Sequence, residues 1–216
     1  MYIPASNAEH RPEVMCDFID AHPLGMLVTL SGGELFATHL PMLLDRARGA
    51  HGVLQGHIAR ANAQHALPAG TADALIIFTG PDAYISPSFY PSKAQHGKVV
   101  PTWNYVAVHV YGSVRYIPDR EFLRNHVERL TARHEGGRAQ PWSVKDAPEE
   151  YIDKMLGAIV GVEVEITRLE GKWKMSQNRS AEDIDGVVAG LGASDDARER
   201  DVAEIVHARR PVATDG

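Results

Sequence analysis

The sequence predicts an α+β fold built on an antiparallel β-barrel with peripheral helices. The candidate strands come first and are spaced as hairpins, two helices interrupt them at 119–160, and another strand follows. That later strand, 162–169 (VEVEITRL), alternates apolar and polar residues as a half-buried strand does. Because strands and helices do not alternate along the chain, this order favours an antiparallel barrel over a series of βαβ units.

Each element is predicted from a local pattern and from the residues at its ends. The first helix has apolar residues at helical spacing and ends before Pro23. The Ser31-Gly32-Gly33 sequence suits a hairpin turn, and Pro41 indicates an edge strand or a bulge. In chain order we expect a helix at 12–21, strands at 24–30, 35–44 and 53–58, a helical turn at 60–67, a strand at 74–79 ended by Gly80-Pro81, a loop at 86–101, a strand at 103–116, helices at 119–134 and 148–160, strands at 162–169 and 171–175, and a surface helix at 194–210.

The last helix carries its own start and stop signals. Ser194 is expected to cap it, and acidic residues in the first turn and arginines in the last turn match the helix dipole. We therefore expect one barrel domain over 1–192, with a helical insert at about 119–160, and a C-terminal helical tail over 193–216.

Composition narrows the classes of function. The 216 residues are 44% hydrophobic and carry a formal charge of −6, so a surface that binds nucleic acid non-specifically is not expected. One stretch of the sequence is locally basic, with Arg168, Lys172, Lys174 and Arg179. The sequence shows no signal peptide and no apolar run long enough to span a membrane, which predicts a cytoplasmic protein.

Several standard chemistries find no support in the sequence. It contains no GxSxG, no GxxxxGK[ST] and no HExxH motif, and its single cysteine, Cys16, lies in no ligand pattern. The Gly-Leu-Gly at 190–192 lacks the third glycine and the preceding strand of a dinucleotide fingerprint. We expect no metal site and no catalytic thiol.

Five short segments combine hydroxyl, amide or cationic side chains with a neighbouring glycine, proline or aromatic residue. Such a combination suits a flat heteroaromatic ligand with a phosphate tail, because amides read a ring edge, aromatics cover a face and cations hold a phosphate. The segments are ATHLP (37–41), GHIARAN (56–62), YISPS (84–88), PTWNY (101–105) and KMSQNR (174–179).

These segments also carry a family resemblance. GHIARAN, FTGPDAYISPSFY, VPTWNYVAVHVYG and KMSQNRS closely resemble the signature stretches of the PaiB family, whose members are described as FMN-binding negative transcriptional regulators. The resemblance extends from Met1 to about Leu191. One departure is Phe89, where the family pattern has tryptophan.

The resemblance implies an FMN-binding split β-barrel that forms a homodimer with flavin at the subunit interface. It places Thr38 and His39 along the flavin ring. It implies further contacts in three groups: His57, Arg60 and Asn62, the last two near the phosphate or ribityl chain; Thr102, Trp103 and Asn104, supplied by the partner subunit; and Lys174, Ser176, Gln177 and Arg179.

Structural roles compete with ligand binding at these positions. Arg60 and Arg179 suit ion pairs, and His39 and His57 suit hydrogen bonds within the protein. Trp103 is equally compatible with a place in the core.

Three functions stay open at this point. The first is an FMN-binding regulator, the second a flavin-dependent oxidoreductase acting on a small molecule, and the third a haem-handling protein with His39, His57 or His96 as axial ligand. Direct DNA binding is not expected, because the two predicted helices of the insert have a 13-residue connection and the second is acidic at its start.

Overall fold

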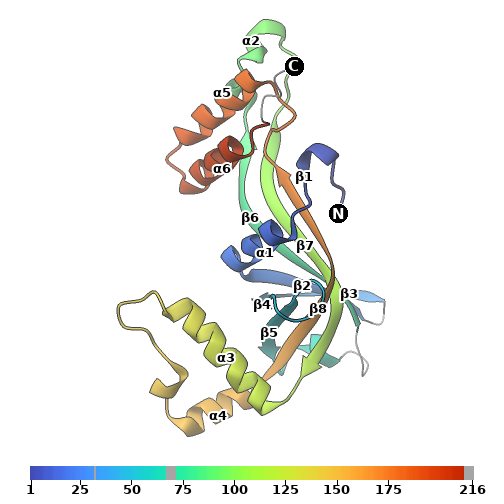
Figure 1. Ribbon diagram of the computed structural model, residues 1–216, viewed down its shortest axis with the longest axis vertical. Helices are drawn as coiled ribbons and strands as arrows, with labels where there is room; N and C mark the ends of the chain where they lie inside the picture. The colour runs from blue at the N-terminus through green and yellow to red at the C-terminus, as the bar shows by residue number, and fades with distance from the viewer. Residues whose placement is uncertain (32, 67–71, 212–216) are drawn as a thin grey trace. The chain divides into compact units, whose positions relative to one another are not determined.

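The computed structural model describes residues 1–31, 33–66 and 72–211 (Figure 1). Its helices are η1 (Ala5–Asn7), α1 (Pro12–Ala21), η2 (Ala63–Ala66), η3 (Pro87–Phe89), α2 (Ser92–His96), α3 (Arg120–Glu135), η4 (Val144–Asp146), α4 (Glu149–Gly157), α5 (Ala181–Gly192) and α6 (Ala197–Ala208). Its strands are β1 (Ala8–Glu9), β2 (Leu24–Ser31), β3 (Glu34–Pro41), β4 (Leu43–Asp45), β5 (Val53–Ala59), β6 (Ala72–Ile85), β7 (Thr102–Ile117) and β8 (Ile159–Lys174).

One sheet contains these eight strands, in the order β3-β2-β6-β7-β8-β5-β4, with β1 paired to β8. The pairings of β2 with β3 and β6, of β5 with β4 and β8, and of β1 with β8 are all antiparallel. This arrangement confirms the predicted antiparallel α+β class with peripheral helices.

Contacts between residues divide the chain into two compact units. Unit 1 comprises residues 1–11, 79–108 and 170–216, and unit 2 comprises 12–78 and 109–169. The long strands β6, β7 and β8 contribute residues to both units. The predicted domain boundaries at 192 and 193 stay predictions.

Unit 2 buries apolar side chains on its strands and in its helical insert. Fully buried Leu27, Leu54 and Val164 belong to strands β2, β5 and β8. The helical insert has its own core of Leu123, Val144, Ile152 and Leu156, which holds α3, η4 and α4 together. Burial of these side chains stabilises the insert by roughly 1.5–3 kcal/mol for each residue.

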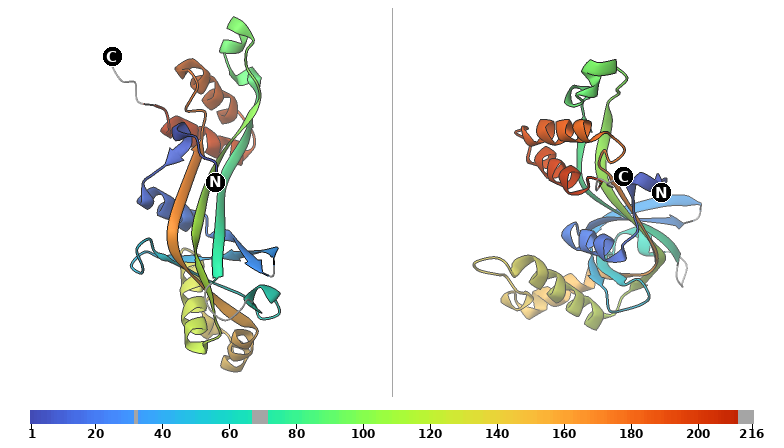
Figure 2. Two further views of the ribbon diagram at one scale, coloured as in Figure 1. Left: turned by 90° about the vertical axis from the view of Figure 1, so that its right-hand side faces the viewer. Right: turned by 45° about the horizontal axis from the view of Figure 1, so that its top comes forward.

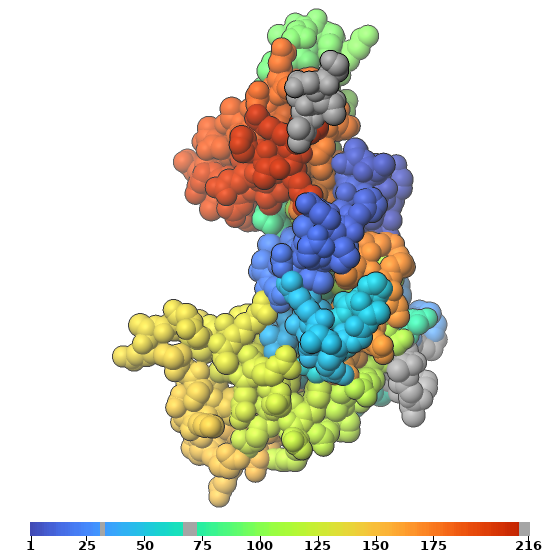
Figure 3. Space-filling model, viewed as in Figure 1, coloured from blue at the N-terminus to red at the C-terminus, as the bar shows by residue number. Residues whose placement is uncertain are grey.

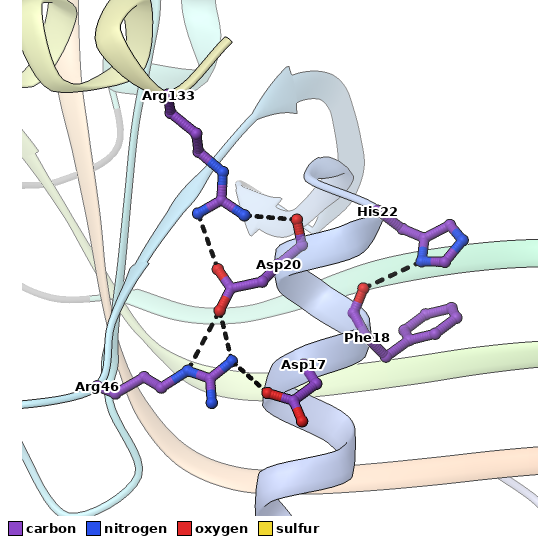
Figure 4. A network of polar contacts seen from close by, with 6 residues as sticks. All are labelled: Asp17, Phe18, Asp20, His22, Arg46 and Arg133. Atoms are coloured by element: carbon purple, nitrogen blue, oxygen red, sulfur yellow. Dashed lines mark hydrogen bonds and ion pairs between the residues drawn. The ribbon is translucent and has the colours of Figure 1, made fainter. Parts of the chain in front are cut away.

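Ion pairs with two arginines connect α1 to neighbouring segments of unit 2. Arg46, which follows β4, donates to Asp17 (2.8 Å) and Asp20 (2.5 Å), and Arg133 of α3 donates to Asp20 Oδ1 (2.9 Å) (Figure 4). Asp20 thus joins two guanidinium groups on the surface of the unit, where such pairs contribute modestly to stability.

In unit 1, α5 and α6 lie side by side in both views of Figure 2. Helix α5 packs closely on η3: a methyl group at Gly186 would lie 2.0 Å from the carbonyl oxygen of Phe89, and one at Gly190 would lie 2.3 Å from its ring. Buried Asp183 fixes the start of α2 by accepting from the Ser92 backbone N–H (3.1 Å) and hydroxyl (2.8 Å). Phe89, the departure from the family pattern, is therefore a packing residue of this helix.

Several elements differ from the sequence predictions. Helix α5 was not predicted, because its glycines lower helix propensity and Gly-Leu-Gly resembles a loop. Strand β6 continues through Pro81. Its pairing with β2 covers residues 74–77, so Pro81 lies beyond these partners, and proline is tolerated on an unpaired strand edge. The predicted strand 35–44 is two strands, β3 and β4, separated by Met42, whose N–H donates to Pro23 (2.9 Å).

The boundaries of other elements also differ from the predicted ones. The predicted strands 162–169 and 171–175 form one strand, β8, and α6 is capped by Asp196, which accepts from Arg198 N (2.9 Å), instead of by Ser194. The predicted turn at 31–33 and helical turn at 60–67 include Gly32 and Leu67, which lie outside the described residues. Within the described part of the chain, no helix is long and apolar enough to cross a membrane.

Candidate functional site

Unit 1 contains a polar cavity of about 220 Å³. It is lined by Pro4, Ser6, Asn7, Thr102, Asn104, Lys174, Ser176, Asn178 and Arg179. Five of these are predicted ligand residues, namely Thr102, Asn104, Lys174, Ser176 and Arg179. We call this cavity the unit 1 pocket.

Strand geometry places one wall of the unit 1 pocket. Thr102 and Asn104 are two residues apart on β7, so both side chains point to the same face of the strand. Asn104 is buried and donates from Nδ2 to Ser176 Oγ at 3.0 Å. This bond joins β7 to the turn that follows β8.

The turn after β8 supplies the opposite wall and is conformationally strained. Ser176 has φ +61°, in the left-handed region that non-glycine residues seldom occupy. Its carbonyl accepts from Arg179 N–H (3.0 Å), and its buried hydroxyl contacts Asn104. A strained residue held by such bonds is typical of binding sites.

The unit 1 pocket is positively charged. Burial lowers the pKa of Lys174, and the nearby charges of Lys172 and Arg179 lower it further. Lys174 Nζ donates to the Thr102 hydroxyl and to the Trp103 carbonyl (2.6 Å), and the Arg179 guanidinium lies 4.8 Å from the centre of the Tyr90 ring. Among residues 1–31, 33–66 and 72–211, no carboxylate lines this pocket and none forms an ion pair with these cations.

Gln177 supports the turn and does not line the unit 1 pocket. Its Oε1 accepts from Met175 N–H at 2.7 Å, and its Nε2 donates to the Trp173 carbonyl at 2.5 Å. Both bonds close the loop that presents Ser176 and Arg179.

Trp103 also lies away from the unit 1 pocket. It alternates with Thr102 and Asn104 on β7, is 52% exposed, and meets Tyr84 edge to face at 6.1 Å. Only its backbone carbonyl, which accepts from Lys174, takes part in the pocket's polar network.

The remaining predicted ligand residues lie in unit 2. Asn62 Nδ2 donates to Thr38 Oγ1 at 2.9 Å, and Asn62 Oδ1 accepts from Gln64 N–H at 2.9 Å. His39 is exposed on β3, opposite Met26. The structure therefore brings Thr38 and Asn62 together.

Arg60 is bonded to the backbone in unit 2. Its Nε donates to the Gly157 carbonyl (2.8 Å) and its Nη2 to the Ile159 carbonyl (3.0 Å). These acceptors lie where α4 ends and β8 begins, so the guanidinium satisfies the Gly157 carbonyl that the helix end leaves free and the first carbonyl of β8.

His57 has a histidine partner that the sequence did not indicate. Its Nδ1 lies 3.1 Å from Nε2 of His126, which is 1% exposed on α3. Burial, with the nearby His57 and Arg129, lowers the pKa of His126 to about 4, and burial also lowers the pKa of His57. Burial therefore favours the neutral form of both rings.

Sequence reasoning missed four residues of the unit 1 pocket: Pro4, Ser6, Asn7 and Asn178. Asn178 lies inside the KMSQNR segment, and its amide side chain could have indicated a ligand-binding residue there. Pro4 belongs to the N-terminal stretch that begins the resemblance, but no local pattern links that stretch to a pocket formed by strands 100 and 170 residues later.

Comparison with known proteins identifies the family. Residues 1–168 match the family model described as "Putative FMN-binding domain". The chain is 30% identical over 206 residues to protease synthase and sporulation protein PAI 2 of Bacillus subtilis, covering 95% of this chain and 96% of that protein. It is 34% identical to the uncharacterized protein AN0679 of Emericella nidulans, covering 97% of each.

Solved structures show the same fold at low identity. The FAD and haem binding protein of Mycobacterium smegmatis superposes with a TM-score of 0.56 at 17% identity, covering 85% of this chain and 80% of that one. The flavocytochrome Anf3 of Azotobacter vinelandii gives a TM-score of 0.53 at 15% identity, covering 77% and 68%. The fold is thus the antiparallel split barrel that the motifs implied. The family model and the Bacillus relative together confirm the resemblance: the chain belongs to the PaiB-like family of FMN-binding domains.

Proposed function

We propose that the protein binds FMN and that the unit 1 pocket holds the terminal phosphate of the flavin. The observation that carries this proposal is the pair of cations, Lys174 and Arg179, in a cavity with no lining carboxylate among the described residues. A bound phosphate monoester, with about two negative charges at neutral pH, compensates this positive charge.

The neutral groups of the unit 1 pocket suit the same ligand. Hydroxyls of Ser6, Thr102 and Ser176 and the amides of Asn7 and Asn178 supply donors for phosphate oxygens. Hydrogen bonds from charged donors contribute roughly 1.5–3 kcal/mol each. The two cations therefore supply most of the binding free energy that the phosphate group adds to flavin binding.

FMN is favoured over FAD on charge. In FAD the same phosphate is part of a pyrophosphate, in which it carries about one negative charge and is followed by a second phosphate and adenosine. Titration of apoprotein with each flavin, followed by fluorescence, tests this preference. Tighter binding of FMN is expected, and equal affinity for FAD or no binding of either flavin contradicts the proposal.

We further propose that the protein works as a homodimer, with a flavin site that uses residues of both subunits. The motive is that the predicted ligand residues fall into two sets, one around the unit 1 pocket and one around Thr38 and Asn62. Static light scattering of apo and FMN-loaded protein tests this: a mass near twice 23.6 kDa is expected. A monomer at micromolar concentration in both states contradicts it.

The role of the flavoprotein is proposed to be regulatory, as in the PaiB-type family. The alternative is a flavin-dependent oxidoreductase acting on a small molecule. Steady oxidation of NADH or NADPH by the FMN-loaded protein favours the oxidoreductase, whereas absence of turnover together with FMN-dependent changes in gene expression in cells favours the regulator.

One observation favours a haem-handling function as a second candidate. His57 has Nδ1 within hydrogen-bonding distance of His126, and histidines that ligate metals usually have their second nitrogen bonded in this way. Two proteins of the same fold are the FAD and haem binding protein of Mycobacterium smegmatis and the flavocytochrome Anf3 of Azotobacter vinelandii. The absorbance spectrum of protein purified from haem-supplemented cells tests it: a Soret band that His57→Ala abolishes supports haem, and a flavin spectrum alone contradicts it.

A further inference from the structure

The N-terminal segment, residues 2–9, forms part of the unit 1 pocket. Pro4, Ser6 and Asn7 line the cavity, and the Asn7 residue is 8% exposed. The Ser6 hydroxyl donates a long bond to Asn7 Oδ1 (3.4 Å), which leaves the donor side of the Asn7 amide for another partner.

Strand β1 attaches this segment directly to the cationic strand. Ala8 pairs with Lys172 and Glu9 with Gly171, two and three residues before Lys174. Lys172 Nζ also donates to the Tyr2 carbonyl at 3.1 Å. The position of this segment therefore determines whether Asn7 lines the unit 1 pocket.

The buried carboxylate of Glu9 is the anchor of the segment. Its side chain is 4% exposed and accepts from Arg11 Nε (2.9 Å) and Nη2 (2.7 Å), and from Arg209 Nη1 (2.5 Å). Hydrogen bonds from Arg11 hold the pKa of Glu9 well below its usual range, and Arg209 adds to the effect. A carboxylate removed from water in this way requires such partners.

Arg209 comes from the residue that caps the end of α6, beyond the residues that match the family model. Its guanidinium also lies 4.7 Å from the centre of the Trp173 ring, next to Lys174. In Figure 3 the red end of this helix lies against the dark blue N-terminal segment. One side chain thus touches both the strand that carries the lysine and the segment that carries Asn7.

We propose that Asn7 is a ligand-contacting residue of the unit 1 pocket and that Arg209 is its positioning residue, acting through Glu9. The C-terminal helix, which we expected to be a surface tail, would then be required for the phosphate site. This inference rests on the proposed function, because the ligand is the phosphate of FMN.

The chain offers a matched control for Arg209. The next residue, Arg210, forms its ion pair with Asp185 of α5, and both side chains are exposed. Arg209→Ala and Arg210→Ala remove the same side chain at adjacent positions of one helix end, but only the first removes a hydrogen-bond partner of Glu9.

The experiment measures affinity for FMN and for riboflavin, which lacks the phosphate, in wild type and in Arg209→Ala, Arg210→Ala and Asn7→Ala. Hydrogen exchange of residues 2–9 is measured on the same apoproteins. We expect Asn7→Ala to weaken FMN about fivefold, the effect of one neutral hydrogen bond. Arg209→Ala should weaken FMN at least as much and accelerate exchange in residues 2–9, whereas Arg210→Ala behaves as wild type and riboflavin binding changes in none of the variants.

Two outcomes overturn the inference. If Arg209→Ala and Arg210→Ala agree in both FMN affinity and exchange, Arg209 does not position the segment. If Asn7→Ala binds FMN as wild type does, Asn7 is not a contact. Failure of the proposed function is distinguishable: wild type then binds no FMN and the ligand contact falls with it, while accelerated exchange in Arg209→Ala still supports the positioning role.

Discussion

At the scale of single residues, the unit 1 pocket depends on an unusual backbone angle. Ser176 has φ +61°, a conformation that suits glycine better, and its hydroxyl bonds with buried Asn104. The residue therefore combines a local cost with a hydrogen bond that offsets it.

Substitutions at Ser176 should separate these two contributions. Ser176→Ala keeps the strained angle and leaves the Asn104 amide without its partner, so we expect a loss of about 1–3 kcal/mol in the free energy of unfolding. Ser176→Gly loses the same hydroxyl but relieves the angle, so its loss should be smaller. Urea denaturation of both variants measures this, and a glycine variant less stable than the alanine variant would show that the angle carries no cost.

Buried His126 predicts a pH dependence of stability. Its folded pKa of about 4 lies below the ordinary value of 6.5, so between these values the unfolded chain binds a proton that the folded chain does not. Stability conferred by neutral His126 is therefore full above pH 6.5 and is lost as the pH falls toward 4, by up to about 3 kcal/mol.

Urea denaturation between pH 7 and pH 4.5 measures this loss, with His126→Gln as the comparison. The variant should lose less stability than wild type over the same interval, because glutamine does not titrate. Identical slopes in the two proteins would rule out His126 as the source.

Five of the candidate ligand residues predicted from the motifs lie together in the structure. Thr102, Asn104, Lys174, Ser176 and Arg179 do line one pocket. Asn7 and the partnership of His57 with His126 were not predicted, because each depends on contacts between segments far apart in the chain.

At the scale of secondary-structure elements, α5 shows why a helix with several glycines could not be predicted from the local sequence. Glycine costs about 1 kcal/mol in a helix relative to alanine, so the local pattern gave no helix signal. In the structure, Gly186 and Gly190 allow the backbone and ring of Phe89 to approach the helix, a tertiary reason that no local pattern contains.

The same packing predicts opposite effects for two alanine substitutions in α5. Gly186→Ala places a methyl group 2.0 Å from the Phe89 carbonyl and should destabilise by about 1–3 kcal/mol. Gly192→Ala meets no atom within 4 Å and should be neutral or stabilise by up to about 1 kcal/mol. Thermal unfolding of the two variants compares them, and equal melting temperatures would mean that α5 does not pack on Phe89 in this way.

The antiparallel class and most strands were predictable from alternation and turn residues. Strand β6 was cut short in the prediction because proline usually ends a strand, whereas Pro81 lies beyond the residues that pair with β2. Local sequence shows that a proline lacks an N–H, but only the sheet order shows whether that N–H was needed.

At the scale of the whole molecule, the charge distribution argues against specific DNA binding by the protein alone. The net charge is −6, and four arginines of the helical insert pair with carboxylates. These pairs are Arg120 with Asp153, Arg124 with Glu149, Arg133 with Asp20, and Arg138 with Glu135. Few cations are left to neutralise phosphates there, and this electrostatic term supplies much of the affinity for DNA.

We therefore expect no sequence-selective DNA binding at about 150 mM salt. A salt-dependent mobility-shift assay with fragments upstream of neighbouring genes, with and without FMN, measures it. Nanomolar and selective binding would promote direct repression over the other proposed functions.

The central claim is that Lys174 and Arg179 hold the phosphate of FMN, and one measurement tests it most directly. It is the ratio of riboflavin to FMN dissociation constants, determined calorimetrically for wild type, Lys174→Ala and Arg179→Ala. Wild type should prefer FMN by about a hundredfold or more, and each variant should reduce that preference by about ten- to a hundredfold while leaving riboflavin affinity unchanged. A wild type that binds both flavins equally, or variants that keep the full preference for FMN, would contradict the account.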